Sequence, residues 1–94
     1  MAEKISQIVW TRQAQESLTS ILEYRYSEIP SAYKIVKTDI IQASKSIVFP
    51  NQFQKDDIFP QYRRIIVRDY KILYKEKDNV AYILNVVCTN AGTN

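Results

Sequence analysis

Positively charged side chains gather in one stretch of this chain. From Tyr62 to Lys77 the sequence has six basic residues and only two acidic ones. The basic residues that could act on a ligand are Arg63, Arg64, Arg68, Lys71 and Lys75. Such cations can hold a phosphate or carboxylate through charge-assisted hydrogen bonds. Each one alone is more simply a solvated side chain that keeps the protein soluble, but as a cluster they indicate an anionic partner.

The chemistry open to these cations is limited by the residue types that the chain lacks. The sequence contains no histidine. This absence excludes an imidazole general base, catalysis by a Ser-His or Cys-His pair, and a His-based metal site. Cys88 is the only cysteine, and in its apolar surroundings it is more typical of a small core residue than of a nucleophile. We therefore expect neither a metal nor a cofactor.

Size and charge set the frame for the fold. The 94 residues and 11.0 kDa predict one domain over residues 1–94, and the net charge of +3 permits an acidic partner without requiring one. No apolar run approaches the roughly 20 residues that cross a bilayer, and Met1–Lys4 starts no signal-peptide pattern. We expect a cytoplasmic protein with no membrane partner.

A short strand and two helices are predicted in the first half of the chain. Lys4–Trp10 is partly alternating and β-branched, which is typical of a strand. Thr11 fits a helix N-cap, and apolar residues at offsets of three and four predict a helix over about Arg12–Ser27. After Pro30 a second such stripe predicts a helix that continues to about Val48. Because the link is so short, the helices should form an antiparallel hairpin.

The second half of the chain changes to a period of two. A loop over Phe49–Gln61 comes first, and we expect Ile58 and Phe59 to attach it to the core. Three strand-like runs follow, at Tyr62–Val67, Tyr70–Lys77 and Val80–Cys88. They predict an antiparallel three-strand meander. The fold class is therefore α+β in the order β-α-α-β-β-β, with the helix hairpin packed on one face of the sheet.

The middle strand shows which face of the sheet should be buried. Successive side chains of a strand point to opposite faces. We expect Tyr70, Ile72 and Tyr74 to face the helices. On the other face lie Lys71 and Leu73, and we expect that face to be exposed to solvent.

Three segments in a fixed order carry a family pattern. They are Trp10-Thr11-x-x-Ala14-x-x-x-Leu18-x-x-Ile21-x-x-Tyr24, then Tyr62-Arg63-Arg64-Ile65-Ile66-Val67-Arg68-Asp69-Tyr70-Lys71-Ile72-Leu73-Tyr74, then Val80-x-x-Ile83-Leu84-x-Val86. At this length and spacing they resemble the RelE/ParE family of toxins from type II toxin-antitoxin systems. The resemblance implies a single RelE/ParE-like toxin domain from a plasmid-stabilisation-like module, which inhibits growth and is neutralised by a cognate antitoxin protein.

The resemblance also assigns roles to the basic residues. Members similar to RelE cut messenger RNA on the ribosome, and members similar to ParE act on DNA gyrase, so the fold alone does not choose the target. The family's strand cations correspond to Arg64 and Lys71, which become the candidate catalytic residues, with Arg63 as an alternative to Arg64. The candidates for contact with the target or the antitoxin are Arg63, Arg68 and Lys75.

The end of the last strand departs from the ribonuclease pattern. Ribonuclease members place an Arg or a His-Tyr pair there, whereas this chain has Val87-Cys88-Thr89-Asn90. The leading hypothesis is therefore a toxin with a ParE-like or unassigned target. One alternative is a ribosome-dependent mRNA endoribonuclease of RelE type. Another is an inactive toxin remnant that acts as an antitoxin-binding protein.

Overall fold

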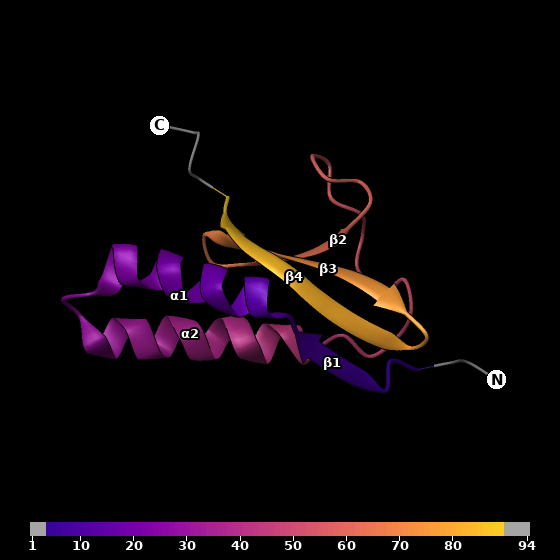
Figure 1. Ribbon diagram of the computed structural model, residues 1–94, viewed down its shortest axis with the longest axis horizontal. Helices are drawn as coiled ribbons and strands as arrows, with labels where there is room; N and C mark the ends of the chain where they lie inside the picture. Colours follow the sequence, from indigo (N-terminus) through magenta and orange to yellow (C-terminus); the bar gives the residue numbers. More distant parts are fainter. Residues whose placement is uncertain (1–3, 90–94) are drawn as a thin grey trace.

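Two helices lie on one face of a four-stranded sheet (Figure 1). The structure is a computed structural model, and it describes residues 4–89. Its elements are β1 (Gln7–Trp10), α1 (Arg12–Tyr26), α2 (Pro30–Ser44), β2 (Arg63–Val67), β3 (Tyr70–Lys77) and β4 (Val80–Cys88). This order confirms the predicted α+β class and the helix hairpin that precedes three strands.

The sheet has the strand order β1-β4-β3-β2. The pairs β2–β3 and β3–β4 are antiparallel, which confirms the meander. The N-terminal strand β1 pairs in parallel with β4, from Gln7 opposite Val80 to Trp10 opposite Ile83. The first strand of the chain therefore lies beside the last one. Helix α1 packs against β4 and α2 packs against β2, so the hairpin covers one face of the sheet.

The helix boundaries follow from local hydrogen bonds. The Thr11 hydroxyl accepts a bond of 3.2 Å from the Ala14 N–H, which confirms the predicted N-cap of α1. Helix α2 begins with Pro30 in its first turn, but it ends at Ser44 rather than near Val48. No helix between residues 4 and 89 is long and apolar enough to cross a membrane.

The early end of α2 has a physical cause in the residues that follow it. The Ser46 and Ile47 N–H groups bond to carbonyls three residues back, so the chain tightens into a turn. This turn places Ile47 in the core, where it is 2% exposed. The Gln52 side-chain oxygen then accepts bonds from the N–H groups of Val48 and Phe49. Burial of Ile47 and the Gln52 bonds replace the last helical turn expected from the sequence.

The core lies between the helices and the sheet. Its buried residues are Ala14, Leu18, Leu22, Val36, Ile40, Ile47, Ile65, Tyr70, Ile72, Tyr74, Ala81, Ile83 and Val86. The predicted orientation of Tyr70, Ile72 and Tyr74 toward the helices is confirmed. The prediction that the opposite face is exposed to solvent is wrong at Lys71 and Leu73, which are 8% and 2% exposed. A long loop covers that part of the sheet.

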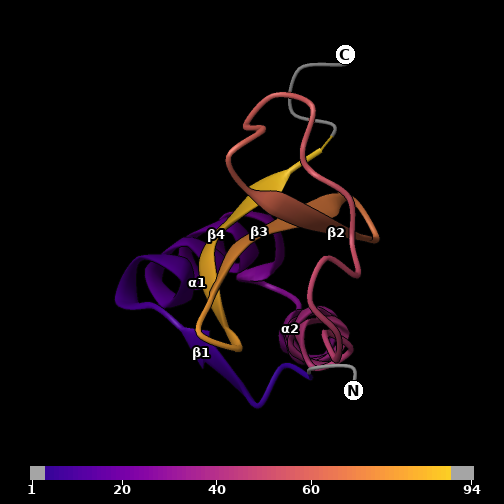
Figure 2. The same ribbon diagram turned by 90° about the vertical axis from the view of Figure 1, so that its right-hand side faces the viewer.

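This crossover loop (residues 49–62) runs from the turn after α2 to the start of β2. Figure 2 shows that it rises from the end of α2 past the edge strand β2 and then lies on the side of the sheet away from the helices. The Phe53 and Tyr74 rings pack edge to face, with their centroids 6.4 Å apart. The backbone of Lys55 forms an isolated antiparallel β-bridge with that of Arg63 at the outer edge of β2. The expectation that Ile58 and Phe59 attach the loop is wrong, because they are 71% and 39% exposed. A buried carboxylate attaches it instead.

Candidate functional site

Arg64 and Lys71 come together on the loop-covered face of the sheet. In the β2–β3 register, Arg64 lies opposite Leu73 and Ile66 lies opposite Lys71, so the two cations are diagonal neighbours. Both reach the carboxylate of Asp56 in the crossover loop. The Lys71 Nζ lies 2.7 Å from Asp56 Oδ1, and a terminal guanidinium nitrogen of Arg64 lies 3.5 Å from the same oxygen.

The Asp56 side chain is completely buried and its second oxygen is also satisfied. Asp56 Oδ2 accepts hydrogen bonds from the backbone N–H groups of Ile58, at 3.0 Å, and Phe59, at 2.9 Å. Burial by itself raises the pKa of Asp56, because it disfavours the charged form. The hydrogen bond from Lys71 and the two backbone bonds outweigh burial and lower the pKa of Asp56 overall. The carboxylate is therefore ionised at neutral pH.

The two cations are largely withdrawn from solvent. The side chain of Lys71 is 10% exposed and that of Arg64 is 17% exposed. Arg64 makes a second ion pair with Asp57, at 3.3 Å. Two cations thus face two carboxylates, and the cluster offers no surplus positive charge to a phosphate. Arg64, Lys71, Asp56 and Asp57 together form what we call the loop-anchoring network.

The network lacks the groups that RNA cleavage needs. Attack by the 2′-hydroxyl requires a base to take its proton and a donor for the leaving oxygen. Lys71 is already donating to Asp56, and an arginine is a poor base. A hollow of about 300 Å³ lies on the same face, lined in part by Phe59, Tyr62 and Leu73, and its lining contains no charged side chain.

The other three candidate residues do not form one patch with the network. Arg63 donates to the Phe53 carbonyl at 2.7 Å and to Asn51 Oδ1 at 2.6 Å, so it secures the start of the crossover loop. Arg68 lies in the β2–β3 turn and pairs with Asp39 of α2 at 2.7 Å. Lys75 is exposed, and within residues 4–89 its side chain makes no ion pair or hydrogen bond.

Two interactions escaped the sequence analysis. Asp56 lies in an Asp-Asp pair of the loop, and this pair near a basic strand was the only indication of charge pairing, although nothing local distinguishes the buried Asp from its exposed neighbour Asp57. Arg25 of α1 bonds the Tyr70 hydroxyl at 3.3 Å and Asp69 at 3.1 Å, which ties the helix to the β2–β3 turn. Both are contacts between residues distant in sequence.

The C-terminal end of β4 carries no cation as far as the structure describes it. Cys88 is partly buried and packs against the core, as expected for a small core residue. Thr89 follows it, and Asn90 lies outside the described residues. No group of three or more Asp, Glu or Cys residues comes close enough to hold a metal ion in the part of the chain from 4 to 89.

A comparison with protein-family models identifies the family of this chain. The model of the family described as "ParE toxin of type II toxin-antitoxin system, parDE" matches residues 8–90. The chain belongs to the ParE toxin family. The match spans all the helices and nearly all of the sheet, and it confirms the family resemblance seen in the sequence. A search of curated proteins found no match.

A solved structure supports the fold of this ParE-family toxin. The "Chromosomal ParDE TA system from P. aeruginosa" superposes with a TM-score of 0.71 at 19% sequence identity. The similarity covers 89% of this chain and 96% of the other. At this identity the likeness shows the shared fold. Membership in a family of toxin-antitoxin systems implies a cognate antitoxin as the partner of this toxin.

Proposed function

We propose that this ParE-family toxin inhibits bacterial growth and that its cognate antitoxin neutralises it. The family match over residues 8–90 supports this proposal. Induction of the chain alone in a bacterium should arrest growth, and co-expression of the adjacent reading frame should restore it. Normal growth at confirmed soluble expression would favour the remnant hypothesis instead.

We infer further that the toxin acts without cutting RNA at Arg64 and Lys71. The observation that carries this inference is the loop-anchoring network, in which both cations are paired with the buried Asp56. A phosphate could bind Arg64 and Lys71 only if the Asp56 carboxylate were displaced, which would leave that buried charge without its partners. DNA gyrase is the target implied by the resemblance to ParE members, and we propose it as the first one to test.

Two assays on the purified toxin separate these mechanisms. In a purified translation mixture we expect no ribosome-dependent cleavage of messenger RNA. In a gyrase reaction we expect loss of DNA supercoiling. The endoribonuclease hypothesis predicts the opposite: codon-specific cleavage that disappears in Arg64→Ala and Lys71→Ala because phosphate contacts are lost. Growth arrest without effect in either assay would assign the toxin to another target.

The antitoxin is proposed to contact the toxin at Lys75. The other basic candidates, Arg63 and Arg68, already hold the loop and the helix, so Lys75 is the one of these three whose side chain makes no ion pair or hydrogen bond within residues 4–89. An acidic antitoxin segment would complement it. Lys75→Glu should lower the rate constant for association with the antitoxin and make that rate constant less sensitive to salt concentration. Lys34→Glu, an exposed charge change on α2, is the matched control and should do neither.

A further inference from the structure

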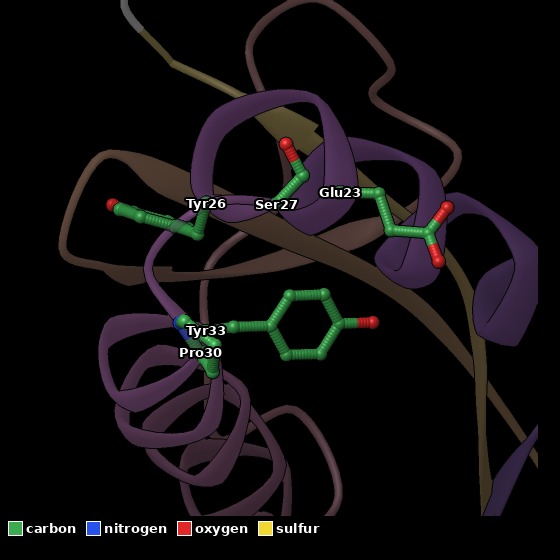
Figure 3. Close-up of a pocket in the computed structure, with 5 residues that line it drawn as sticks. All are labelled: Glu23, Tyr26, Ser27, Pro30 and Tyr33. Carbon is green, nitrogen blue, oxygen red and sulfur yellow. The ribbon is translucent and has the colours of Figure 1, made fainter.

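A second hollow lies at the tip of the helix hairpin, where α1 ends and α2 begins. It measures about 330 Å³ and is lined by Glu23, Tyr26, Ser27, Pro30 and Tyr33. In Figure 3 the Tyr33 hydroxyl and the Glu23 carboxylate lie toward one end of this tip pocket, and the Tyr26 ring lies toward the other. Figure 1 places the hairpin tip at the end of the molecule away from β1.

The walls of the tip pocket combine aromatic rings with one carboxylate. The faces of tyrosine rings attract cations through their quadrupoles. A guanidinium group suits such walls, because it is planar, stacks on rings and can give two parallel hydrogen bonds to a carboxylate. The same chain already shows the preference: the Arg25 guanidinium carbon lies 5.8 Å from the Tyr26 ring centroid. Arg25 is bonded to Tyr70 and Asp69 and does not line the pocket.

The charge of the pocket also points to a cationic occupant. Glu23 is exposed and has no ion pair within residues 4–89, whereas Glu16 on the same helix pairs with Arg12 at 3.5 Å. Glu23 lies in the last turn of α1, where the partial negative charge of the helix end disfavours a carboxylate. A bound cation relieves that repulsion. Glu28 in the link to α2 adds a second exposed acidic side chain to the tip of a protein with net charge +3.

We propose that the tip pocket receives an arginine side chain from a partner protein. Its guanidinium would lie against the Tyr33 ring and donate to the Glu23 carboxylate at the same end of the pocket. The volume is at the low end for small-molecule sites and suits a single long side chain. This partner differs in charge from the acidic antitoxin segment proposed at Lys75, so the inference does not depend on the antitoxin contact or on the toxic target.

A titration with a small arginine probe tests the proposal on the full chain. N-acetyl-arginine methylamide is added to the ¹⁵N-labelled protein, and two-dimensional NMR spectra are followed to saturation. We expect saturable shifts confined to the signals of the residues that line the pocket. N-acetyl-citrulline methylamide, which is neutral and nearly the same shape, should not bind. N-acetyl-lysine methylamide should bind more weakly, because an ammonium group cannot stack or form the paired bonds.

Substitution of the pocket carboxylate completes the test. Because Glu23 is exposed, the Glu23→Gln variant should fold normally. It should raise the dissociation constant of the arginine probe by at least about threefold. Glu16→Gln on the same helix is the matched control and should leave the affinity unchanged. The proposal is overturned if no saturable shifts appear at the probe's solubility limit. Equal binding of the citrulline or lysine probe, or unchanged affinity in Glu23→Gln, would overturn it as well.

Discussion

Removal of the Asp56 charge should destabilise the toxin strongly. Asp56→Asn keeps nearly the same shape but leaves the buried Lys71 ammonium, 2.7 Å away in the native protein, without its counter-ion. An uncompensated buried charge of this kind costs about 3 to 5 kcal/mol. A protein of this size is stable by roughly 5 to 14 kcal/mol, so the loss would be a large fraction of the total. The neighbouring Asp57 is 87% exposed, and Asp57→Asn should cost less than about 1 kcal/mol.

Urea unfolding measures this difference directly. Trp10 is the only tryptophan, and its indole N–H donates to the Ser44 hydroxyl at 3.1 Å, so its fluorescence reports the packing of β1 on α2. The double variant Asp56→Asn/Lys71→Met removes both members of the buried pair and should recover most of the lost stability. Equal, small losses of stability in Asp56→Asn and Asp57→Asn would show that Asp56 is not the anchor of the loop.

Four further predictions concern buried groups. The lowered pKa of Asp56 means that its stabilisation is complete above the ordinary value of 3.8 and is lost as the pH falls through the lower folded value; urea titrations across acid pH should show this loss in the wild type and not in the double variant. The Tyr74 hydroxyl is buried with no hydrogen-bond partner among residues 4–89, and burial raises its pKa to about 12, so Tyr74→Phe should leave the free energy of unfolding unchanged or raise it. Tyr70→Phe, which loses the bond from Arg25, should lower it by about 0.5 to 1.5 kcal/mol in the same assay. Ile72→Ala, at a position that is 0% exposed, should cost about 2 to 5 kcal/mol by thermal or urea unfolding, and an unchanged stability would contradict the assigned orientation of β3.

The regular elements were predictable because their information is local. The apolar stripe of α1, the Thr11 cap and the strand character of β3 each depend on a few neighbouring residues, and all three agree with the structure. The alternation expected along β3 does not, because Tyr70 to Tyr74 are all buried. The end of α2 was missed by four residues, since it depends on Ile47 turning into the core rather than on helix propensity. The parallel partner of β1 was left open, because strand pairing across most of the chain has no local pattern.

The candidate site was predicted only in part for the same reason. The family pattern selected Arg64 and Lys71 as candidate catalytic residues, and the structure places them as diagonal neighbours. Their burial depends on where the crossover loop lies. Aliphatic and aromatic residues are the usual loop anchors, which favoured Ile58 and Phe59 in the sequence. The actual anchor, Asp56, becomes favourable only when two backbone N–H groups and Lys71 converge on it. That convergence is a property of the fold and not of any short segment.

We propose that Arg64 and Lys71 hold the crossover loop and do not carry out catalysis. The decisive measurement is growth after induction of Asp56→Asn/Lys71→Met, compared with growth after induction of the wild type at equal soluble levels. The variant lacks one candidate catalytic cation but keeps a neutral, packed pair beneath the loop. We predict that it arrests growth as the wild type does and is still neutralised by the antitoxin. Loss of growth arrest in a variant that is folded and still binds the antitoxin would mean that Lys71 takes part in the toxic activity.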